Sequence, residues 1–201
     1  MKTRNLLVVF VALVWASTAK STLQIPATAT FDGAEYTIID VVGKLPSPTD
    51  FDIDAVSEAT GLSGHVAGYV LEFLIDAERI FLNGMYVLSL SGEYPPINGV
   101  RADVKCFGAN GVAGCNPGEY SNLKLRLEFD GRLRIAKDFI KSCYDHLDAE
   151  PQMFRVVKDL TFENGQLVNV LDRSDEASAI QRQFKDPSEC RKGLSFTMSP
   201  L

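Results

Sequence analysis

The sequence predicts an α+β domain, in which an antiparallel sheet built from hairpins is covered by one long amphipathic helix. Asp32-Gly33, Asp130-Gly131 and Asn164-Gly165 each lie between segments rich in strand-forming residues, as in a two-residue hairpin turn. Apolar residues recur at helical spacing over residues 62–82. Because the expected helices lie mostly outside the hairpin segments, these observations favour a sheet with helices on one face.

Residues 1–19 have the order of a secretory signal peptide. A cationic tip precedes the apolar residues 6–15, and small residues follow up to Ala19. The apolar run holds about ten residues, whereas a membrane-spanning helix needs about 20. We therefore expect cleavage after Ala19 and no membrane span. Residues 20–201 are expected to form a single secreted α+β domain, a size that one core can fill.

The charge balance is acidic, with a formal net charge of −6. Loss of Lys2 and Arg4 with the signal peptide would make it two units more negative. A negative surface repels nucleic acid and anionic lipid headgroups. No nucleic-acid partner is expected.

The first elements follow from turn residues. Residues 22–31 and 34–42 flank Asp32-Gly33 and predict a hairpin, while the glycine and prolines of residues 43–49 predict a loop. Acids at alternate positions from Asp50 could suggest a calcium loop, but an EF-hand needs Gly at the sixth position and Glu at the twelfth. Ala55 and Gly61 stand there instead, so residues 50–60 are predicted to be a short helix.

Residues 62–82 carry the helical period that predicts the covering helix. Its apolar stripe consists of Leu62, Val66, Tyr69, Val70, Phe73, Leu74, Ala77, Ile80 and Phe81. If Gly64, Gly68 and the prolines hold helix and sheet apart, an apolar cavity remains between them. The ligand-binding residues predicted for it are Val66, Tyr69, Val70, Phe73 and Ala77.

Two further strands are expected at residues 85–90 and 99–107, around a proline-containing turn. Residues 123–140 then show apolar residues alternating with charged ones, the pattern of a half-buried strand. With Asp130-Gly131 in the middle, this stretch is predicted to be a hairpin with one apolar face.

The four cysteines are Cys106, Cys115, Cys143 and Cys190. An even number in an exported chain predicts two disulfides, and the pairs Cys106–Cys115 and Cys143–Cys190 are favoured among three connectivities. Zinc binding is the alternative. No pair has CxxC spacing and the two histidines are far apart in the sequence, so no metal site is predicted.

Residues 142–146 place Ser142, Cys143, Asp145 and His146 close together in the sequence. Members of a catalytic triad converge in space from distant positions, so this proximity argues little, and no nucleophile motif surrounds it. No catalytic residue and no cofactor is predicted. A hydrolase that uses His146 is kept as one functional hypothesis, ranked after the two non-enzymatic functions described next.

The last elements are a third hairpin, with strands at residues 154–162 and 166–171, and a helix that Ser174 caps. This helix is expected to reach about Phe184, with Ala177, Ile180 and Phe184 on one face. The function expected from all these elements is that of a secreted, non-enzymatic carrier of a hydrophobic small molecule. An extracellular protein-binding module is the main alternative, with an extracellular protein as its partner.

Overall fold

The structure is a computed structural model that describes residues 27–55, 68–109, 112–115, 117–140 and 149–183; for residues 106–109 and 112–115 only the backbone is considered. Ten strands dominate it. They are β1 (Thr28–Phe31), β2 (Ala34–Val42), β3 (Tyr69–Asp76), β4 (Arg79–Val87), β5 (Cys106–Ala109), β6 (Val112–Cys115), β7 (Gly118–Arg126), β8 (Gly131–Phe139), β9 (Phe154–Glu163) and β10 (Gln166–Asp172). The helical elements are α1 (Ser174–Gln181) and the short 3₁₀ segments η1 (Pro48–Phe51) and η4 (Pro151–Met153).

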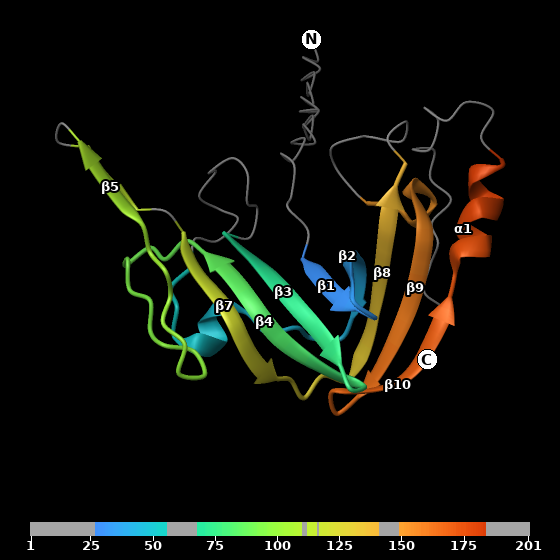
Figure 1. Ribbon diagram of the computed structural model, residues 1–201, viewed down its shortest axis with the longest axis horizontal. Helices are drawn as coiled ribbons and strands as arrows, with labels where there is room; N and C mark the ends of the chain where they lie inside the picture. The colour runs from blue at the N-terminus through green and yellow to red at the C-terminus, as the bar shows by residue number, and fades with distance from the viewer. Residues whose placement is uncertain (1–26, 56–67, 110–111, 116, 141–148, 184–201) are drawn as a thin grey trace, which may run out of the picture.

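Eight strands form one sheet in the order β10-β9-β8-β2-β1-β3-β4-β7. All neighbours are antiparallel except β1 and β3, which run parallel. Figure 1 shows the sheet folded into two walls, β3, β4 and β7 on the left and β8, β9 and β10 on the right, which converge at the lower end. There β10 also pairs with β4, through Gln166 and Arg79.

Backbone hydrogen bonds close this lower end of the sheet. The Leu127 N–H donates to the carbonyl of Ile80 (3.1 Å), and the Gly165 N–H donates to that of Phe129 (2.9 Å). The Leu167 N–H in turn donates to the carbonyl of Glu78 (2.8 Å). The connection from β7 to β8 therefore lies between the start of β4 and the β9–β10 turn, and joins the two walls.

The main core fills the space between the walls. In β1, β2 and β3 the buried residues alternate with more exposed ones, as the two-residue period of a strand requires. Buried side chains from both walls form one hydrophobic cluster, and several of them are fully buried. Its members with no exposed area are Ala29, Ile80, Leu82, Met85, Val87, Leu133, Ile135 and Leu160.

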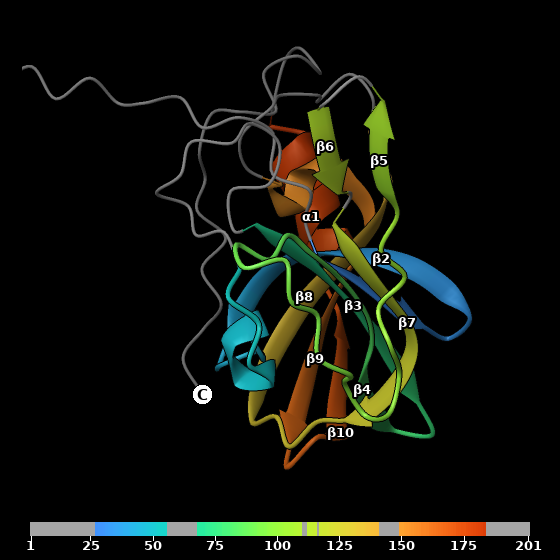
Figure 2. The ribbon, with the colours of Figure 1, turned by 90° about the vertical axis from the view of Figure 1, so that its left-hand side faces the viewer.

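A smaller core lies on the outer face of β8 and β9, under α1. It joins Ala136, Met153, Phe154 and Val157 to Ala177 of the helix. Figure 2 shows the same arrangement from the side, with α1 behind the upper part of the sheet. Strand β8 is thus covered on both faces, which explains why residues 132–136 are all buried.

The predicted long helix over residues 62–82 is wrong: residues 69–87 are the hairpin of β3 and β4, and residues 62–67 lie outside the described part of the chain. The sheet is therefore not covered by one long amphipathic helix, although the α+β class holds broadly. This run is so rich in apolar residues that it satisfies both the helical and the strand period. Inside it, Leu71, Phe73 and Ile75 are buried at strand spacing.

The hairpin predicted for residues 123–140 is also wrong. Its two halves are strands, but β7 pairs with β4 while β8 pairs with β2 and β9, and no described pairing joins β7 to β8. Asp130 and Gly131 therefore lie in a connection between the two walls and do not form a hairpin turn. The Asp130 Oδ1 atom accepts a hydrogen bond from the Asn164 N–H (2.6 Å), so this residue pair is used to close the sheet.

The other Gly-containing turns are confirmed. Strands β1 and β2 pair around Asp32-Gly33, and β9 and β10 pair around Asn164-Gly165. The last helix is confirmed as α1, but the predicted cap is wrong: Ser174 is the first helical residue and Arg173 is the N-cap. The helix ends at Gln181, and Phe184 lies outside the described residues. Residues 50–55 do not form an α-helix, since η1 ends at Phe51 and residues 56–60 are not described. The strand predicted at residues 85–90 ends with β4 at Val87, and residues 101–105 form no named strand.

Strands β5 and β6 form a separate two-stranded sheet. Its backbone register places Cys106 opposite Cys115. A disulfide between these two residues stays a prediction, as does the Cys143–Cys190 pair, which lies outside the described residues. Among the described helices, none has the length and apolar character needed to cross a membrane.

Candidate functional site

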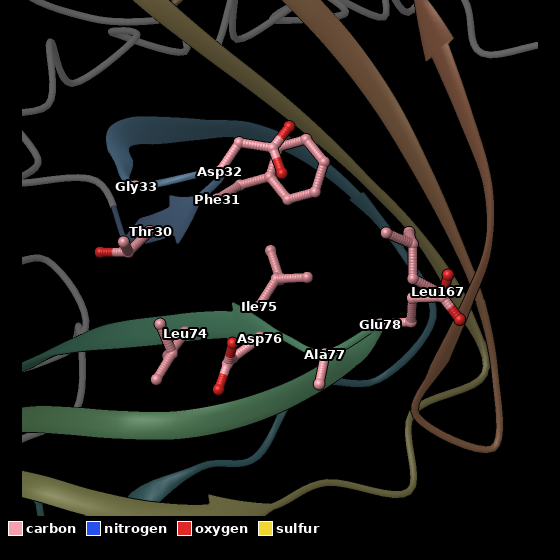
Figure 3. A pocket seen from close by; sticks show the side chains of 10 residues that line it. All are labelled: Thr30, Phe31, Asp32, Gly33, Leu74, Ile75, Asp76, Ala77, Glu78 and Leu167. Atoms are coloured by element: carbon pink, nitrogen blue, oxygen red, sulfur yellow. The ribbon is translucent and has the colours of Figure 1, made fainter.

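A hollow of about 500 Å³ lies at the lower end of the sheet, where the β1–β2 turn, the β3–β4 turn and the start of β10 come together. Figure 3 shows its lining side chains, which come from segments far apart in the sequence. The lining residues are Thr30, Phe31, Asp32, Gly33, Leu74, Ile75, Asp76, Ala77, Glu78 and Leu167.

The floor of the hollow is apolar. Phe31 and Ile75 are neighbours in the parallel register of β1 and β3, and their side chains are 6% and 7% exposed. Leu167 of β10 lies across the hollow from them and is half-buried against the main core (Figure 3). Phe31 is the last residue of β1 and pairs with Ile75, so Asp76 at the end of β3 pairs with β4 on one side and has no β1 residue on the other.

Two tight turns form the rim. Both central residues of each turn have positive φ: 50° and 71° at Asp32 and Gly33, and 46° and 60° at Ala77 and Glu78. These are the φ values of a type I′ turn, the form that matches the twist of a hairpin. The first turn has the expected Asp-Gly sequence. The second has no Gly, Asn or Asp at its two central positions, so its sequence lacks the usual signal of a type I′ turn.

The rim carries three carboxyl groups, those of Asp32, Asp76 and Glu78, and all three residues are exposed. Within the described part of the chain, none of them has a hydrogen bond or ion pair through its side chain. Arg79 stands opposite Asp76 in the β3–β4 register, but it neither lines the hollow nor forms an ion pair there. The hollow thus combines an apolar floor with a negative rim.

The structure places the predicted ligand-binding residues apart from one another. Phe73 lies in the main core with 2% of its surface exposed, and Tyr69 and Val70 are half-buried in β3. Ala77 lines the hollow, and Val66 lies outside the described residues. Phe31, Ile75 and Leu167 are not predictable from the sequence as site residues, because nothing local indicates that their three strands converge.

A buried ion pair on the outer face of the sheet is a second polar cluster. Arg134 of β8 is 1% exposed and donates from Nε (2.6 Å) and Nη2 (2.9 Å) to the carboxylate of Asp159 on β9. Arg173, just before α1, donates to the same carboxylate (3.2 Å). Burial raises the pKa of Asp159, but the hydrogen bonds and charges of Arg134 and Arg173 outweigh it and hold the pKa below its usual range.

This cluster joins the sheet to the helix. Arg173 also donates to Glu176 in the first turn of α1 (2.6 Å), so a chain of charges runs from β8 through β9 into the helix. All the groups of this chain pair with one another. The arrangement is that of a structural ion-pair network. Such networks shift pKa values although their residues have no catalytic role.

A third group of charges lies on the outer face of the sheet. Burial, and then the negative charges of Glu35 and Glu119, raise the pKa of Glu72. A shifted carboxyl group is a common sign of a functional site. Glu72 is not among the residues that line the hollow, however, so this shift does not belong to the candidate site.

No protein-family model, no curated protein and no solved structure matches this chain.

Proposed function

We propose that the protein is a secreted, non-enzymatic carrier of a hydrophobic small molecule, which it holds in the hollow at the lower end of the sheet. The observation that carries this proposal is the apolar floor formed by Phe31, Ile75 and Leu167. A volume of about 500 Å³ lies within the range of small-molecule sites. The site proposed here replaces the cavity expected beneath a long helix.

The lining residues favour binding over catalysis. They include no histidine, cysteine or lysine, and Thr30 supplies the one hydroxyl group. An activated nucleophile needs a base within hydrogen-bond distance. Thr30 has no hydrogen bond to any lining carboxylate among the described interactions. The described lining of the hollow therefore has no nucleophile paired with a base.

A protein-binding module is the second candidate, favoured by the outer strand β10. Val168, Val170 and Leu171 are 48%, 41% and 42% exposed. Beyond the pair at Gln166, no described strand lies on the outer side of β10. Exposed strand edges with apolar side chains are places where an extended peptide can add a further strand.

Export is the first expected result. Peptide mapping of the unreduced native protein should give an N-terminal peptide that starts near Lys20 and a linked Cys106–Cys115 peptide, because a chain that has entered an oxidising compartment forms its disulfides there. Recovery of Met1 with all cysteines reduced would contradict the secreted assignment.

Ligand carriage is tested by Leu167→Trp. The larger side chain would occupy part of the hollow, so we expect the affinity for the neutral apolar dye Nile red to fall about tenfold, which corresponds to about 1.4 kcal/mol. Dye fluorescence titration measures this directly. Val170→Trp is the matched control, since it puts the same side chain on an exposed position of β10 away from the hollow.

The melting temperature of each variant shows whether it is folded. Saturable dye binding to the wild type and to Val170→Trp, with weak binding to a folded Leu167→Trp, supports the carrier. Absence of saturable dye binding by the wild type, or equal affinity in both folded variants, would rule out the hollow as the carrier site.

A further inference from the structure

We propose that the hollow selects a ligand with a cationic head and an apolar tail, such as an alkylammonium compound. This inference rests on the proposed function, because it concerns the same site, and it adds the charge of the ligand. The floor and the rim suit different parts of a ligand. The apolar floor can contact a hydrocarbon chain, and the acidic rim can attract a positive group that remains near water.

The rim charges come from both turns that border the hollow. Asp32 follows Phe31 directly on the β1 side, and Asp76 and Glu78 follow Ile75 on the β3 side. Figure 3 shows Glu78 next to Leu167, and the backbone hydrogen bond between these residues places the two positions together. A ligand with its tail against the floor would therefore have its head close to carboxylates.

These carboxylates are available for a ligand. Carboxyl groups of Asp and Glu are ionised at neutral pH. None of the three forms an ion pair in the described part of the protein, although Lys44, Lys105, Lys158 and Arg173 do pair with acids elsewhere. No lysine, arginine or histidine lines the hollow, so an anionic head would meet repulsion from three groups and attraction from none.

A metal ion fits this site less well than an organic cation. No cluster of three or more His, Cys, Asp or Glu side chains in the described part of the chain has the geometry to hold a metal ion. Calcium requires six to eight oxygen ligands at 2.3–2.6 Å. An ammonium group has no such requirement, because charges spread around an opening attract it at several ångströms.

The test compares three ligands with the same ten-carbon chain: decylammonium, decanol and decanoate. Each displaces Nile red from the wild-type protein, and the displacement constants are measured at low salt. We expect decylammonium to bind about tenfold more tightly than decanol, because each exposed carboxylate attracts a cation weakly and three of them act together. Decanoate should bind more weakly than decanol. High salt should remove most of the difference, because it screens exposed charges.

Asp32→Asn gives a clean single change. Asparagine adopts positive φ readily, and Asn-Gly is a favoured type I′ pair, so the turn should be retained. The affinity for decylammonium should fall about twofold to fourfold, while that for decanol stays the same. Asp52→Asn is the matched control: Asp52 is exposed, has nearly the same φ (58° against 50°) and lies outside the hollow. It changes the net charge equally.

The triple variant Asp32→Asn, Asp76→Asn, Glu78→Gln should bind decylammonium and decanol equally well. Unchanged discrimination in this variant, with folding intact, would overturn the cationic selectivity while leaving the carrier in place. A wild-type protein that binds decanoate most tightly and decylammonium most weakly would also overturn the cationic selectivity while leaving the carrier in place. Failure of Nile red and of all three ligands to bind would instead overturn the carrier itself.

Discussion

Replacing Gly165 by alanine is expected to lower the free energy of unfolding by about 3–5 kcal/mol. Gly165 has a φ of 71°, where an L side chain is strained. A Cβ atom added there would also overlap with the carbonyl oxygen of Leu127 and lie 3.0 Å from its carbonyl carbon. Backbone atoms cannot swing aside as a side chain can, so the closure of the sheet at residues 127–130 would have to open.

Gly33→Ala is the matched control for this change. Gly33 has the same φ of 71° and holds the same place in a type I′ turn, but a Cβ atom there would meet nothing within 4 Å. It should therefore cost only the strain of the left-handed conformation, about 1–2 kcal/mol. Urea denaturation of both variants measures the difference. Equal losses would mean that the β7–β8 connection does not press against the β9–β10 turn.

Asp159→Asn is expected to lower the free energy of unfolding by about 3–5 kcal/mol at neutral pH, because it leaves the guanidinium of Arg134 buried without its counter-charge. Asp103→Asn is the control. It removes an ion pair to Lys105 (3.2 Å) in which both side chains are more than 60% exposed, and such pairs contribute at most about 1 kcal/mol. Chemical denaturation at pH 7 compares the two.

The effect of Asp159 also depends on pH in a defined direction. Because the folded protein holds the pKa of Asp159 below its usual range, the stabilisation is complete above the unfolded pKa of about 3.9 and is lost as the pH falls through the lower folded pKa. The difference between wild type and Asp159→Asn should thus be constant near neutrality and shrink below about pH 4. A difference that grows on acidification would contradict the assignment.

A double variant separates pairing from packing at this site. Arg134→Met with Asp159→Leu replaces the buried pair by apolar side chains of similar size, which is often neutral for stability. We expect it to regain most of the stability lost in Asp159→Asn. If the double variant is as unstable as the single one, the loss comes from packing between the sheet and α1 instead of from an unpaired charge.

The hairpins differ in how visible they are in the sequence. Asp32-Gly33 and Asn164-Gly165 predict their turns because glycine adopts positive φ without strain, and such a signal is local. The turn at Ala77 and Glu78 adopts the same conformation with ordinary residues. Strands β3 and β4 pair at eight positions, and seven of these pairs lie beyond the pair that closes the turn. This pairing holds the turn in its conformation, and the turn residues themselves give no sequence signal for it.

The choice of strand partners also lies beyond a local reading. Residues 123–140 alternate as two strands should, and Leu123, Leu127 and Phe129 are buried as expected. Whether Asp130-Gly131 turns back or crosses over depends on the partners offered by the rest of the chain. Here β7 pairs with β4 and β8 pairs with β9, so Asp130-Gly131 connects two strands that do not pair with each other.

By itself the sequence determined that Leu123, Leu127 and Phe129 face inward, where two of the turns and α1 lie, and that the charge is acidic. Each of these depends on composition or on neighbours within a few positions. The tertiary structure alone decided that residues 69–87 form a hairpin, that β1 runs parallel to β3, and that Phe31, Ile75 and Leu167 line one hollow. The physical reason is that a near-continuous apolar run fits a helix or a strand equally well, and only the pairing of distant segments distinguishes them.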